Sequence, residues 1–90
     1  MDKIAVEELD QQNFRVTVQG RVTTTHEVHV KAEVAARLAP GKAVSELVQK
    51  SFEFLLKREP NTSILRRFDL TVISQYFPDY EHTIRAAFGD

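Results

Sequence analysis

The 90-residue sequence contains no cysteine and only three glycines and three prolines. Without cysteine the chain can form no disulfide, no thiolate metal site and no cysteine nucleophile. The few glycines leave no phosphate-binding loop, and the patterns G-x-x-x-x-G-K, G-x-G-x-x-G and G-x-S-x-G are all absent. We therefore expect no cofactor and no enzymatic activity.

A charge excess of either sign is also missing, as are long apolar segments. The 12 basic and 13 acidic residues give a net charge of −1, so no overall field favours a polyanion or a membrane surface. No window approaches the ~18 apolar residues of a membrane-spanning helix. The opening segment, MDKIAVEELDQQ, has no features of a secretory or transit signal. We expect a cytoplasmic, bacterial-type protein in which residues 1–90 form a single domain.

Alternating hydrophobicity in residues 14–30 predicts an antiparallel β-hairpin. A three-residue loop at 19–21 would place Val18 opposite Val22, and Val16 opposite Thr24, with the apolar residues on one face. A two-residue turn at 19–20 would instead pair an apolar face with a polar one. The preceding Ile-Ala-Val segment forms either a third strand or a loose arm, and we favour the strand.

The rest of the chain predicts helices. An alanine-rich segment at 31–38 indicates a short helix, and residues 44–58 a long helix that ends before a proline. Apolar spacing and capping residues indicate three more short helices, at 63–68, 70–77 and 80–88. Strands followed by helices predict an α+β fold, in which three to four helices pack on a hairpin or a three-stranded sheet.

The long predicted helix is apolar over roughly 200° of its circumference, about twice the usual stripe. Its central apolar residues should be buried against the hairpin, a predicted core of Leu47, Phe52 and Leu55 over Val16, Val18 and Val22.

The excess apolar surface favours a protein-interaction module that acts through protein contact, with a homodimer as one form of partner. The candidate binding residues are apolar and lie in the C-terminal half, namely Phe54, Leu56, Tyr76, Phe77 and Tyr80. In a homodimer, Phe54 or Leu56 should lie at the contact.

The alternative is a nucleic-acid-binding regulator, because basic residues concentrate around the predicted helix junction. They are Lys57, Arg58, Arg66 and Arg67. A solvated helix end explains the same cluster, since basic residues at a helix C-terminus complement its dipole. The chain also lacks the basic excess that nucleic-acid modules usually carry.

The histidines do not form a metal-binding pattern. His26 and His29 would point to opposite faces of a strand, and His82 is distant in the sequence. A zinc site needs three or four converging ligands. We expect His26 to be half-buried at a sheet edge and His29 to be solvated.

Overall fold

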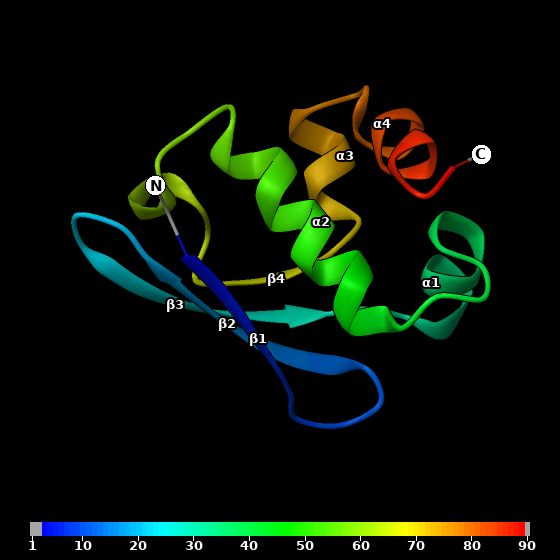
Figure 1. Cartoon of the computed structure of the whole chain (residues 1–90), viewed down its shortest axis with the longest axis horizontal. Helices are drawn as coiled ribbons and strands as arrows, with labels where there is room; N and C mark the ends of the chain where they lie inside the picture. Colours follow the sequence, from blue (N-terminus) through cyan, green and yellow to red (C-terminus); the bar gives the residue numbers. More distant parts are fainter. Residues whose placement is uncertain (1–2, 90) are drawn as a thin grey trace.

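The alternating segments of the N-terminal half form a sheet in the computed structural model, which describes residues 3–89 (Figure 1). Strands β1 (Lys3–Glu8), β2 (Asn13–Gln19) and β3 (Thr23–His29) run antiparallel in sequence order. A short strand, β4 (Arg67–Asp69), joins β3 in parallel, which gives the order β1-β2-β3-β4. The favoured strand at Ile4-Ala5-Val6 is therefore part of the sheet.

Helices cover one face of this sheet. Helix α2 (Val44–Leu56) crosses above the sheet, contacts β1 and packs against α4 (Tyr80–Ala87) on its other side (Figure 1). Helices α1 (Ala32–Leu38) and α3 (Val72–Tyr76) complete the helical layer, and a 3₁₀ turn, η1 (Asn61–Ser63), leads into β4. This arrangement is an α+β fold, as the order of strands and helices predicts.

The core lies between the sheet and α2, because one parity of each strand is apolar. Phe14, Val16 and Val18 of β2 are buried beneath α2 residues that include Leu47, Phe52 and Leu55. These buried positions confirm the predicted core except at Val22, which is 58% exposed.

The hairpin register explains the exposure of Val22. Val18 pairs with Thr24, and Val16 pairs with His26, so the loop comprises residues 20–22. The predicted pairing of Val18 with Val22 was wrong by two residues. A shift of two positions leaves every side chain on its original face, so the hydrophobic pattern alone does not distinguish the two registers.

The predicted helix at 63–68 was also wrong, because that segment runs from the last residue of η1 into β4. The residues on either side of β4 form non-local backbone hydrogen bonds to β3, from Glu27 N to Arg66 O (2.8 Å) and from Leu70 N to His29 O (2.9 Å). The side chain of Phe68 then enters the core from this strand. Pairing with β3 overrides the local helical spacing of the apolar residues.

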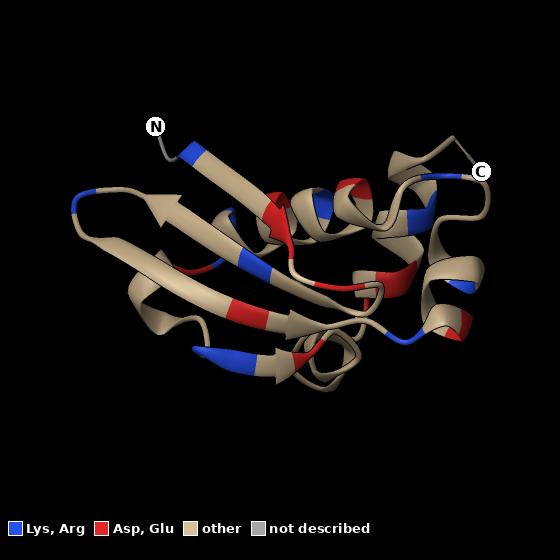
Figure 2. Ribbon diagram, turned by 90° about the horizontal axis from the view of Figure 1, so that it is seen from below, with Lys and Arg blue, Asp and Glu red and all other residues tan. Residues whose placement is uncertain are grey.

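The opposite face of the sheet is open and polar, and charges alternate across its four strands (Figure 2). Glu7, Arg15, Glu27 and Arg67 are cross-strand neighbours in this order. Arg15 binds Glu7, and Arg67 binds Glu27, both at 3.3 Å. We call these four residues the charge row. Opposite charges at paired positions favour this strand alignment.

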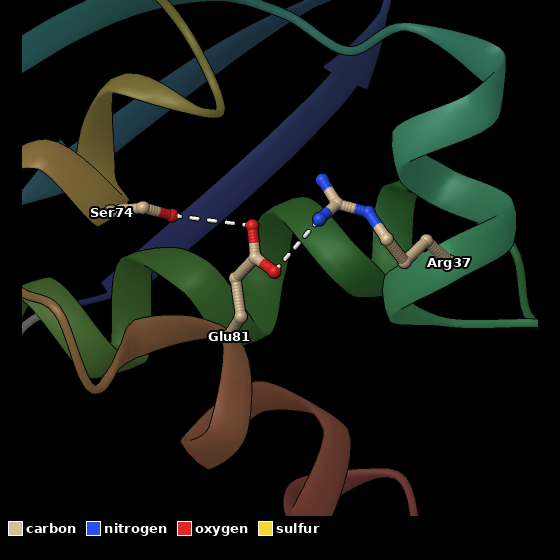
Figure 3. Close-up of polar contacts among 3 residues, drawn as sticks. All are labelled: Arg37, Ser74 and Glu81. Atoms are coloured by element: carbon tan, nitrogen blue, oxygen red, sulfur yellow. Dashed lines mark hydrogen bonds and ion pairs between the residues drawn. The ribbon is translucent and has the colours of Figure 1, made fainter.

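Polar contacts connect the helices to one another. Glu81 of α4 accepts hydrogen bonds from Arg37 of α1 (2.8 Å) and Ser74 of α3 (3.4 Å), so one carboxylate bridges three helices (Figure 3). Inside the layer, the buried hydroxyl of Tyr80 bonds that of Ser51 on α2 at 2.6 Å. None of the helices in residues 3–89 is long and apolar enough to cross a membrane.

Candidate functional site: an apolar groove beside α3

An apolar groove of about 240 Å³ opens between the C-terminal end of α2, the segment that leads into β4, and α3. We call it the α3 groove. Apolar side chains form most of its walls, and Glu59 is the one charged residue among the described residues that line it. Its lining consists of Leu55, Glu59, Ser63, Ile64, Leu65, Phe68, Val72, Ile73, Tyr76 and Phe77.

Two of its residues are unusually exposed for their size. Leu65 is 49% exposed and Tyr76 is 67% exposed, although both carry large apolar surfaces. Only Leu9 and Val22 are comparable among the large hydrophobic side chains of residues 3–89. Leu65 and Tyr76 therefore concentrate exposed apolar surface around a single concave site, which is a common property of binding sites.

Glu59 places a carboxylate in these apolar surroundings. Partial burial raises the pKa of the Glu59 carboxyl, because its charged form loses solvation. Within the described residues, no arginine, lysine or histidine forms an ion pair with it. An incoming cation would supply that pairing.

A buried hydrogen-bond network fixes the position of Leu65. His26 Nδ1 donates to Leu65 O at 2.7 Å, and His26 Nε2 accepts from Thr24 Oγ1 at 2.8 Å. Asn61 Nδ2 donates to Thr24 Oγ1 at 2.9 Å and to Val22 O at 2.8 Å. Each polar group thus has a partner only if His26 is neutral with its proton on Nδ1. The network attaches one wall of the groove to β3.

The expectation that His26 lies half-buried at a sheet edge was wrong. Its ring is fully buried in the sheet interior, next to Phe52 at a centroid distance of 5.3 Å. Burial lowers the pKa of His26, with a further contribution from the charge of Arg66, while the bond to Leu65 O acts in the opposite direction. His29 lies on the open face, as predicted, but is partly buried and bonds Asn13 Oδ1 at 3.1 Å.

The opposite wall of the groove is α3. Ile73 anchors this helix in the core, and Asp69 accepts hydrogen bonds from the backbone and hydroxyl of Thr71 just before the helix begins. With Ser74 bound to Glu81, the short helix is held at both its start and its middle. These contacts fix the backbone of α3, and therefore the position of Tyr76 in its last turn.

The structure separates the five candidate binding residues. Tyr76 and Phe77 line the α3 groove. Phe54 and Tyr80 are buried at 4% and 0% exposure, so they belong to the core and not to an accessible surface. Their rings meet edge to face at 5.3 Å. Leu56 is half-buried and lies outside the groove lining.

Sequence reasoning missed most of the groove. The spacing of Ile64, Leu65 and Phe68 predicts a helical turn in the core, and no sequence pattern marks Glu59 as part of a site. The one signal in the sequence was the density of apolar residues after Pro60. That signal indicates a buried segment equally well.

The basic cluster of the alternative hypothesis is partly engaged within the chain. Arg58 bonds Asp79 at 3.0 Å and lies over the Phe54 ring at 3.6 Å from its centroid. Arg67 pairs with Glu27 in the charge row. Lys57 and Arg66 are exposed. Among the described residues, Arg66 forms no ion pair with Glu59 or Asp69.

No protein-family model matches the chain, and no curated protein or solved structure is significantly similar to it.

Proposed function

We propose that the protein is a non-enzymatic interaction module of the cytoplasm. In this proposal, the α3 groove binds a short segment of a partner protein through a large apolar side chain. The observation that carries the proposal is the shared location of Leu65 and Tyr76, two of the most exposed large hydrophobic residues, on one apolar concavity. A cavity of about 240 Å³ is of a size to accept one or two side chains, not a bulky cofactor.

Glu59 gives the proposed partner a second property. The Glu59 carboxylate has no ion pair within the described chain, so removal of its remaining water by a ligand costs desolvation free energy. A lysine or arginine of the partner, placed beside its apolar anchor, would offset this loss by forming a charge-assisted hydrogen bond. We therefore infer a preference for a segment that combines a large apolar residue with a neighbouring basic residue.

The alternative of nucleic-acid binding has less support. Sheet surfaces that bind RNA usually present aromatic side chains for base stacking. On its strands the open face here has no phenylalanine, tyrosine or tryptophan, and His29 is its one aromatic ring. Its two arginines, Arg15 and Arg67, are paired with carboxylates. Of the four clustered basic residues, only Lys57 and Arg66 lack an ion-pair partner among residues 3–89. No specific observation favours this second function.

Peptide phage display tests the proposal, because the selection requires no identified partner. A random peptide library would be selected for binding to the immobilised protein. Peptides that also bind a Leu65→Asn/Tyr76→Ser double variant would be removed in a counter-selection step. These substitutions remove exposed apolar surface and leave the buried core residues unchanged, so the variant should fold. We expect the enriched peptides to share a large apolar residue with a lysine or arginine close to it.

Two results would overturn the proposal. The first is recovery of the same peptides on the double variant, which would place their binding elsewhere. The second is an absence of any enriched sequence on the wild-type protein. A Glu59→Gln variant then tests the basic preference separately: it should retain the apolar requirement and lose the selection for lysine and arginine.

A further inference from the structure

The outer edge of β1 is unpaired and belongs to the longer of the two edge strands of the sheet. Leu9 N donates to Asn13 O at 2.8 Å, which marks the hydrogen-bonded positions between β1 and β2. These positions alternate along an antiparallel pair, so Lys3, Ala5 and Glu7 direct their backbone groups to β2. The backbone N–H and C=O groups of Ile4 and Val6 therefore point away from the sheet. Within residues 3–89, no backbone hydrogen bond outside the regular elements reaches them.

The edge lacks two of the features that prevent strand addition, proline and a β-bulge, although Lys3, Glu7 and Glu8 give it charged side chains. Its sequence KIAVEE contains no proline and no glycine, and its pairing with β2 runs without a bulge from Lys3 to Glu8. Natural proteins commonly protect a free edge by such interruptions. Ile4 and Val6 on the core-facing side are only half-buried. The edge thus offers both unpaired backbone groups and partly exposed apolar side chains.

When two copies of β1 are aligned antiparallel, a basic residue can lie opposite an acidic one and apolar residues opposite each other. We propose that β1 pairs antiparallel with β1 of a second copy of the chain, about a two-fold axis at Ala5. In that register Lys3 lies opposite Glu7 of the second copy on the open face, and Ile4 lies opposite Val6 of the second copy on the core-facing side. Directly opposite side chains share a face of the sheet, and the exposure pattern of β1 assigns the charged and apolar residues to separate faces.

The backbone geometry fits the same axis. Ile4 and Val6 both direct their N–H and C=O groups outward, so the Ile4–Val6 pairs become the hydrogen-bonded positions of the new ladder. Ala5 then pairs with its symmetry equivalent at a position without hydrogen bonds, where side chains lie closest, and alanine is small enough for that position. The two sheets become one continuous eight-stranded sheet with a closed two-fold interface.

In this register the charge row of the open face continues from one copy into the other. The charge row runs Arg67, Glu27, Arg15, Glu7 from β4 to β1, with alternating signs. Pairing about Ala5 places Lys3 of the second copy next to Glu7, which continues the alternation across the interface. An axis at Val6 would keep every side chain on its face, but it would place Glu7 opposite Ala5 of the second copy and Ile4 opposite Glu8. Both the charged and the apolar pairs would then be lost.

Charge exchange between copies tests the pairing. We would measure association by sedimentation from about 1 µM to about 1 mM at low ionic strength, a range that covers weak and moderate affinities. Lys3→Glu and Glu7→Lys each convert two attractive pairs into two repulsive ones. Each should raise the dimer dissociation constant about tenfold or more. Lys42→Glu is the control, because it makes the same change of charge at an exposed position outside β1. It should leave the dimer dissociation constant at the wild-type value.

The decisive sample is an equimolar mixture of the Lys3→Glu and Glu7→Lys proteins. In the heterodimer, each glutamate at position 3 or 7 meets a lysine on the other copy, so association should return to the wild-type range. The Lys3→Glu/Glu7→Lys double variant should recover in the same way as a homodimer. Circular dichroism of each variant checks that its fold is intact, because Glu7→Lys also removes the contact with Arg15.

Three results would overturn the inference. A wild-type protein that stays monomeric throughout the range has no such edge pairing. Single variants that dimerise as well as the wild type would place the interface elsewhere. A mixture that associates no better than its components would exclude the antiparallel register about Ala5.

Discussion

Asn61 is a buried residue whose removal should weaken the whole domain. Its side-chain Nδ2 donates to Val22 O at 2.8 Å and Thr24 Oγ1 at 2.9 Å, with a longer contact to Val18 O at 3.4 Å. A net contribution of ~0.5–1.5 kcal/mol for each of the two short bonds gives about 1–3 kcal/mol. Because Asn61→Ala also deprives the part-buried Val22 O and the buried Thr24 Oγ1 of this donor, we expect a loss near ~2–3 kcal/mol.

Urea denaturation followed by circular dichroism measures this loss. For a small domain with an m-value of about 1 kcal/mol/M, a loss of 2 kcal/mol lowers the unfolding midpoint by about 2 M. Asn61→Asp is nearly isosteric but replaces the donating amide by a carboxylate, so it should be at least as damaging. Thr62→Ala, in the exposed neighbouring position, serves as the control. A loss below about 0.5 kcal/mol for Asn61→Ala, or one equal to that of the control, would refute the structural role of the network.

Two further predictions concern the core. Phe52 is 0% exposed and packs against the rings of His26 and Phe68, so Phe52→Ala should destabilise the domain by about 3–5 kcal/mol; a soluble variant with an unchanged denaturation midpoint would contradict this. The lowered pKa of His26 means that, below its ordinary value of about 6.5, the unfolded chain takes up a proton that the folded chain resists. Stability should therefore be complete above pH 6.5 and decline as the pH falls towards the folded-state pKa. His26→Gln should lack this component, and parallel pH profiles for the two proteins would disprove it.

The parts of the fold with local signals were predictable from the sequence. Helix α2 begins at Val44 as predicted and ends two residues before the predicted limit. Both signals for this helix, its apolar spacing and the proline that follows it, are local in the sequence. The strand around Ile4 was likewise identified from a short apolar segment.

Features that depend on distant partners were not predictable in this way. β4 forms because β3, about 40 residues earlier, offers unpaired backbone groups, and no local pattern encodes that pairing. Tyr80 was predicted to be one of the residues of a protein-binding surface, but it is buried. Its burial depends on a hydrogen bond to Ser51, 29 residues away, which satisfies the hydroxyl inside the core. The α3 groove unites three such segments, so its shape could not be derived before their packing was known.

The central claim, that the α3 groove binds an apolar and basic peptide segment, is tested most directly by mapping the contact. A peptide enriched by phage display would be titrated into the ¹⁵N-labelled protein, and the backbone amide signals followed by NMR. We predict that the largest shifts fall on Leu65, Val72, Tyr76 and Phe77 around the groove, and that the signals of the open sheet face stay in place. Shifts centred on the open face, or on Lys57 and Arg66 away from the groove lining, would contradict the account.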